Sequence, residues 1–123
     1  MDDPRFSHLA YYERLVLEIK SQILNGALAV GDKLPSVRDM AKQMQLNPNT
    51  VAKAYKALEA QQVVEVKPGL GSFVAAPKPG TDDKTLGTLQ ARFQAVVVSA
   101  LTVGVPLTEL EEWLQDAAKG GIS

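Results

Sequence analysis

The chain has 123 residues, of which 46% are hydrophobic and 22% are charged, and its formal net charge is −1. This length and composition suit one compact domain with an appendage, and they argue against general disorder. The chain has no cysteine and a single histidine, His8, so disulfides, thiol catalysis and a metal site are not expected. No segment resembles a signal peptide or a membrane span. We therefore expect a cytoplasmic protein that uses no cofactor and does not bind membranes.

The charge is divided unevenly along the sequence. Residues 31–80 contain seven Lys or Arg and four Asp or Glu, whereas three basic and six acidic residues follow from residue 81 onward. Phosphate binding depends on the cations at an interface and not on the total charge. The middle of the chain could therefore bind a polyanion despite the negative net charge.

The first helix is predicted to begin near Tyr12 and to end at Gly26, which supplies the left-handed residue that often closes a helix. Residues 1–10 show little periodicity, and we expect them to form a partly ordered arm. Residues 28–35 follow the helix as a connector with a Gly-Asp turn. The apolar stripe of this helix consists of Tyr12, Leu15, Val16, Ile19, Ile23 and Leu24.

Two further helices, separated by a very short turn, are predicted between Leu34 and Gln61. Ser36, with Asp39 three residues later, imitates a capping box at the start of one helix, whose apolar positions are Val37, Met40, Ala41 and Met44. Asn47 followed by Pro48 is a favoured start for the other helix, whose apolar positions are Val51, Ala54, Tyr55 and Leu58.

The opposite face of the later helix carries Asn49, Thr50, Lys53 and Lys56. These hydrogen-bonding and cationic side chains gather in its N-terminal half, as in a DNA recognition helix whose first turns reach base edges. An ordinary helical hairpin with a solvated face is the alternative that this segment alone leaves open.

A β-hairpin is predicted next, because Val64 and Val66 alternate with charged residues and residues 72–75 form a second short strand after a tight reversal. Three helices followed by a hairpin is the order of a winged helix-turn-helix, a mainly α fold. In the wing, Lys67 supplies a cation, and Gly69 and Gly71 allow close approach of the backbone to DNA. The alternative is that these glycines serve only the turn.

The Pro-rich residues 77–81 are predicted to be a linker between a winged domain, 1–76, and a helical dimerisation region, 82–123. One helix of about twenty residues should end at the break 103–106. Thr108 and Glu111 form a capping-box pattern for another helix, which Gly120 ends. The apolar faces of the two helices include Leu86, Leu89, Phe93, Val96, Val97, Leu101, Leu110, Trp113 and Leu114.

Two amphipathic helices of this size cannot bury both apolar faces by themselves, so they need a further surface. The simplest partner is the same helix pair from a second copy of the chain, which would make a homodimer. Folding back onto the winged domain is the alternative, which the stiff linker disfavours.

Three blocks of sequence resemble a known family: GDKLPSVRDMA at 31–41, NPNTVAKAYKALE at 47–59 and GLGSFV at 69–74. They are similar to the N-terminal domain of GntR-type bacterial transcriptional regulators, and the short two-helix tail most resembles the YtrA-type subfamily. The resemblance implies dimerisation through this tail. It also implies that Tyr55 occupies a frequent family position, although its apolar stripe favours a core role. Gln62 departs from the family pattern, which has glycine there, so the turn into the wing could be strained.

The resemblance also implies which residues contact DNA. Arg38 matches a DNA-contacting arginine, Asn49, Thr50 and Lys53 match recognition-helix positions, and Ser36, Gly69 and Gly71 match phosphate or groove contacts. The complete predicted DNA-binding set is Ser36, Arg38, Asn47, Asn49, Thr50, Lys53, Lys67, Gly69 and Gly71.

These observations predict a homodimeric repressor that binds a palindromic DNA operator, with half-sites about one helical turn apart or a multiple of it. A winged-helix module that binds protein instead of DNA is the alternative. No enzymatic activity is expected, because no catalytic set of side chains can be recognised. A small-molecule effector of unknown identity, bound near Phe93 and Trp113 at the dimer interface, is left open.

Overall fold

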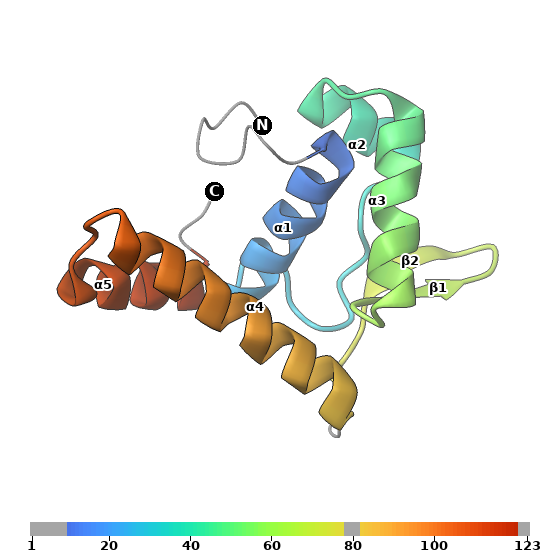
Figure 1. Ribbon diagram of the computed structural model, residues 1–123. Coiled ribbons are helices and arrows are strands. Elements are labelled where there is room, and N and C mark those ends of the chain that lie inside the picture. Colours follow the sequence, from blue (N-terminus) through green and yellow to red (C-terminus); the bar gives the residue numbers. More distant parts are fainter. Residues whose placement is uncertain (1–9, 78–81, 121–123) are drawn as a thin grey trace.

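The computed structural model of the protein describes residues 10–77 and 82–120 (Figure 1). Within these ranges the order of elements is α1 (Tyr11–Leu24), α2 (Val37–Met44), α3 (Pro48–Ala60), β1 (Val64–Lys67), β2 (Gly71–Val74), α4 (Asp83–Thr102) and α5 (Leu107–Ala118). This order confirms the mainly α, winged helix-turn-helix class. His8, nearly all of the predicted arm and most of the predicted linker lie outside the described residues.

The first three helices and the hairpin enclose one hydrophobic core. Val51, Ala54 and Leu58 of α3 are fully buried, so the predicted stripe of this helix is confirmed. The prediction for Leu24 was wrong, because its side chain is 63% exposed. It lies in the last turn of α1, on a different side of the helix from the core-facing Ile23. The buried apolar residues are Leu15, Val16, Ile19, Leu34, Met40, Ala41, Val51, Ala54, Tyr55, Leu58, Val64 and Val74.

Both predicted helix starts in the helix-turn-helix are confirmed by hydrogen bonds. The Asp39 N–H donates to Ser36 Oγ at 3.0 Å, and the Asn49 N–H donates to Asn47 Oδ1 at 2.8 Å. Each cap provides an acceptor for a backbone donor that the helix itself cannot satisfy. Between the helices, Gln45 adopts a left-handed conformation with φ 55°. This conformation turns the chain within three residues.

The wing is a hairpin in which Lys67 pairs with Gly71 across a turn of residues 68–70. The second strand therefore begins one residue earlier than predicted. The connector between α1 and α2 also joins the sheet edge. The Leu34 N–H donates to the Ser72 carbonyl at 2.8 Å, and the Val74 N–H donates to the Asp32 carbonyl at 2.8 Å. The base of the wing is thereby tied to the segment that leads into α2.

The C-terminal part consists of two helices joined by the break at 103–106, as predicted. The predicted capping box at Thr108 was wrong, because α5 begins at Leu107 and Pro106 occupies the cap position. The Pro106 carbonyl accepts hydrogen bonds from the N–H groups of Glu109 and Leu110, which places Thr108 inside the first turn. Gly120 has φ 75° and ends α5 in the expected left-handed conformation. No helix in the described ranges is long and apolar enough to cross a membrane.

Candidate nucleic-acid interface

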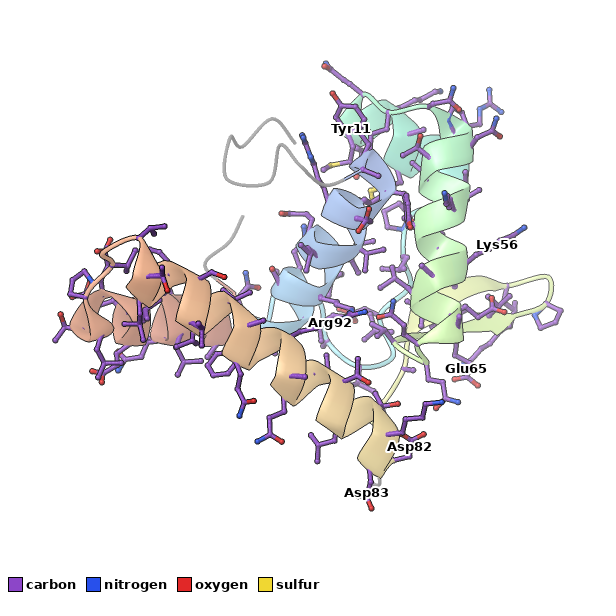
Figure 2. The ribbon with its side chains drawn as sticks, viewed as in Figure 1. Tyr11, Lys56, Glu65, Asp82, Asp83 and Arg92 are labelled. Atoms are coloured by element: carbon purple, nitrogen blue, oxygen red, sulfur yellow. The ribbon has the colours of Figure 1, made fainter. Side chains whose placement is uncertain are left out.

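The N-terminal half of α3 presents a polar face to solvent. Asn49, Lys53 and Lys56 are exposed and Thr50 is half-buried, while Val51 on the opposite side is fully buried. Figure 2 shows Lys56 projecting from α3 on the side away from α1. The helix thus rests on the core and presents Asn49 and Lys56 to solvent.

Lys53 has an aromatic neighbour on another helix. Its Nζ lies 4.2 Å from the centroid of the Tyr12 ring of α1. An ammonium group over an aromatic face is attracted by the ring quadrupole. Tyr12 is half-buried and was predicted only as part of the apolar stripe. Sequence periodicity places Tyr12 on the correct face but could not show that its ring also holds a cation of the polar face.

The N-terminal ends of α2 and α3 together carry three exposed polar residues. Ser36 and Arg38 are exposed at the N-terminal end of α2, and Asn47 is exposed at the start of α3. Ser36 Oγ and Asn47 Oδ1 accept capping bonds, so the hydroxyl hydrogen of Ser36 and the amide hydrogens of Asn47 remain able to donate. These donors suit phosphate oxygens.

The two wing glycines have different surroundings. Gly69 has φ 77° and open space around it, so turn geometry alone accounts for a glycine there. Gly71 has φ 125°, and a Cβ atom at this position would lie 2.8 Å from Cε of Lys33. Lys67 does not extend from the wing tip, because its Nζ lies 4.7 Å from the centroid of the Phe73 ring.

Lys33 is a basic residue beside the wing that was not in the predicted DNA-binding set. It pairs with Phe73 in an isolated β-bridge and passes beside Gly71. With Ser36 and Ser72 it lines a cleft of about 300 Å³ between the wing and the start of α2. Its basic character was visible in the sequence, but its place depends on pairing between the connector and β2.

Tyr55 anchors this arrangement from inside the core. Its hydroxyl donates to the Pro35 carbonyl at 2.7 Å, and its side chain is only 8% exposed. Burial raises the pKa of Tyr55 to about 12, because the ionised phenolate would lose its hydration. The predicted core role is confirmed, and the bond joins α3 to the residue before Ser36.

The C-terminal helices show the opposite pattern, because neither α4 nor α5 contains a buried residue. Phe93 is 56% exposed and Trp113 is 46% exposed. Val97 and Leu110 are partly buried. The other residues of the predicted dimerisation set are exposed, namely Leu86, Leu89, Val96, Leu101 and Leu114.

Comparison with known proteins identifies the family. Residues 11–74 match the family described as "Bacterial regulatory proteins, gntR family". The chain is 35% identical to the HTH-type transcriptional repressor YtrA of Bacillus subtilis (strain 168), over 97% of this chain and 94% of that protein.

Solved structures agree with this match. A transcriptional antiterminator from Listeria monocytogenes EGD-e superimposes with a TM-score of 0.83 at 31% identity, covering 95% of this chain and 88% of that one. YtrA from Sulfolobus acidocaldarius, described as a GntR-family transcription factor, gives a TM-score of 0.56 at 26% identity, covering 74% and 85% of the two chains. The protein therefore belongs to the GntR family of bacterial regulatory proteins and is a DNA-binding transcription regulator, not an enzyme.

Proposed function

We propose that this protein is a homodimeric repressor that binds a palindromic operator, with α3 of each protomer in a major groove. The observation that carries the homodimer is the exposed apolar face of α4 and α5. Leu86, Leu89 and Phe93 on α4 are each more than half exposed. A monomeric protein rarely leaves contiguous apolar surface of this extent in water, so a second copy of the same helix pair is the simplest cover.

The DNA contacts proposed for each protomer come from three places. Asn49, Thr50 and Lys53 on α3 would approach base edges, because they are the polar side chains of its first turns. The N-terminal ends of α2 and α3 would contact the adjacent sugar-phosphate backbone of the DNA through Ser36, Arg38 and Asn47. Lys67, Gly69 and Gly71 of the wing would contact phosphate or the minor groove, and Lys33 would add a cation at the wing base.

A footprint on the DNA upstream of the gene for this protein tests the operator. Two protected half-sites related by two-fold symmetry, about one helical turn or a multiple of it apart, are the expected result. A single asymmetric protected site, or binding of equal strength to random duplex, would contradict the palindromic operator.

The homodimer can be tested separately from DNA binding by sedimentation equilibrium of two matched variants. Val96 belongs to the predicted dimerisation face, whereas Val98 lies on another side of α4, and the two valines are 61% and 62% exposed. Val96→Asp should produce monomers, because a charge would be buried in the interface. Val98→Asp should remain dimeric. Monomeric unmodified protein at micromolar concentration would refute the proposed dimer.

Repression is proposed because the relative from Bacillus subtilis is named a transcriptional repressor. A reporter gene behind the footprinted operator should increase in expression when the regulator gene is deleted. Decreased expression would instead indicate an activator. This role is exercised where the chromosome lies, so the cytoplasm is the proposed location.

A small-molecule effector could bind in a shallow, open groove of about 500 Å³ between α4 and α5. Val96, Ala100, Val103 and Trp113 are among its lining residues. The sequence left open an effector site near Phe93 and Trp113, and of these two residues only Trp113 lines the groove. The lining residues are mostly apolar, so an apolar ligand is favoured. An effector would be recognised as a compound that changes the affinity of the protein for DNA in a gel shift.

A further inference from the structure

The end of α5 touches the end of α1 at Gly120, although the helices belong to different halves of the chain. A Cβ atom on Gly120 would meet the backbone carbonyl oxygen of Ser21 closer than any real Cβ contact, and it would lie 3.0 Å from Cβ of Asn25. Gly120 is itself buried, whereas no residue within α5 is buried. The absence of a side chain therefore allows the two backbones to meet.

Ser21 provides a second observation at the same place. It is the only buried polar residue in the described ranges, at 2% exposure, and it lies near the end of α1. Its carbonyl also accepts the Asn25 N–H at 2.9 Å, so this carbonyl is held in a regular helical position. Figure 1 shows the last turn of α5 approaching the end of α1, on the side of α1 away from α3. The junction is therefore built from backbone atoms that cannot rotate aside.

We propose that Gly120 is a positioning residue. Its backbone contact with Ser21 of α1, called the seat below, holds the end of α5 against α1 and thereby fixes the winged domain relative to α4 and α5. In a homodimer held together by α4 and α5, this seat sets the separation of the two α3 helices. The separation of half-sites that the dimer prefers follows from it. This step rests on the proposed homodimer, whereas the seat itself is a property of one protomer.

Distance measurements between paired spin labels test the seat in one protomer without DNA. The chain has no cysteine, so Lys56→Cys on α3 and Gln115→Cys on α5 introduce the only two labelling sites, both at exposed positions. Dilution with excess unlabelled protein leaves one labelled protomer in each dimer. The unmodified Gly120 background should give one narrow distance distribution.

Gly120→Ala and Gly120→Asn should shift or broaden this distribution, because each adds a Cβ atom against the Ser21 carbonyl. Asn tolerates the left-handed conformation better than Ala, so the pair separates the steric clash from backbone strain. Gly26→Ala is the matched control, because Gly26 at the end of α1 has φ 85° and a Cβ atom added there would meet nothing within 4 Å. Its distribution should remain narrow.

Distributions for both Gly120 variants that superimpose on the unmodified one would overturn the proposal. Loss of cooperative unfolding in both variants would also overturn it, because Gly120 would then be a folding requirement and not a positioning residue. Failure of the homodimer alone would leave the distance within the protomer unchanged, so the two proposals can fail separately.

The consequence for DNA is tested with duplexes in which the gap between the two half-sites varies by single base pairs. The unmodified protein and Gly26→Ala should select one spacing, and the Gly120 variants should select a different spacing or accept several with at least tenfold weaker preference. An unchanged spacing preference in Gly120→Ala and Gly120→Asn would refute the role in half-site selection.

Discussion

Replacing Gln62 with glycine should stabilise the protein, because Gln62 occupies a backbone conformation that suits glycine. Its φ is 61°, in the left-handed region, and it follows the last turn of α3. The Gln62 N–H donates to the Glu59 carbonyl at 2.9 Å, and the Val63 N–H donates to the Leu58 carbonyl at 2.9 Å. These two bonds form a Schellman motif, which requires the left-handed residue whether or not it is glycine.

The size of the effect is the difference between two opposing contributions. A residue with a Cβ atom loses about 1–2 kcal/mol in the left-handed conformation. Glycine avoids this loss but has a more flexible unfolded chain, which costs about 0.5–1 kcal/mol on folding. The Gln62 side chain is exposed, so little packing is lost. We expect Gln62→Gly to raise the free energy of unfolding by about 0.5–1 kcal/mol.

Urea unfolding measures this change as a higher midpoint at an unchanged slope, with all proteins at the same concentration. Gln61→Gly is the matched control, because the adjacent Gln61 has φ −84° and gains nothing from glycine. Gln45, with φ 55° at the end of α2, should respond like Gln62. The reasoning is refuted if Gln62→Gly is no more stable than Gln61→Gly.

Three other substitutions test separate parts of the interface. Tyr55→Phe removes the bond to the Pro35 carbonyl and should lower the free energy of unfolding by about 1–2 kcal/mol at pH 7. Burial in the folded protein raises the pKa of Tyr55 to about 12, so between pH 10 and 12 the Tyr55 hydroxyl ionises in the unfolded chain only. The stability difference between the unmodified protein and Tyr55→Phe should therefore shrink as the pH rises through that range. A constant difference in urea titrations would contradict the burial argument. Asn49→Ala should weaken specific binding by about 1–3 kcal/mol if Asn49 reads a base, and equal loss on random duplex would exclude that role. Lys67→Ala should weaken binding to all duplexes and flatten the salt dependence of affinity, and an unchanged slope would exclude a phosphate contact.

The sequence was sufficient to predict features that depend on neighbouring residues in the chain. Ser36 and Asn47 cap their helices through bonds to residues two or three positions later, so local spacing identified both. Gly26 and Gly120 end helices in the left-handed conformation for the same local reason. The expected strain at Gln62 is also confirmed by its positive φ.

Features that depend on pairing between distant segments were not predictable in this way. Lys33 joins the edge of β2 through one isolated bridge, and three connector residues are too few to show an alternating pattern. Lys53 meets Tyr12, and Gly120 meets Ser21, only because the fold brings separate helices together. Local patterns can also mislead. The sequence pattern at Thr108 predicted a helix cap, but the helix begins at Leu107 because the extended residue Pro106, two positions earlier, occupies the cap position.

The arrangement of the halves reconciles an acidic chain with DNA binding. Helix α5, which carries four of the acidic residues, lies on the side of α1 away from α3 (Figure 1). Electrostatic interactions in water fall off over a Debye length of about 8–10 Å at physiological salt. Helix α1 lies between α5 and α3, and a helix with its side chains is about 10–12 Å across, which is about one Debye length. Salt therefore screens much of the repulsion between α5 and phosphates near α3, so the cations around the wing and α3 can attract DNA although the chain as a whole is acidic.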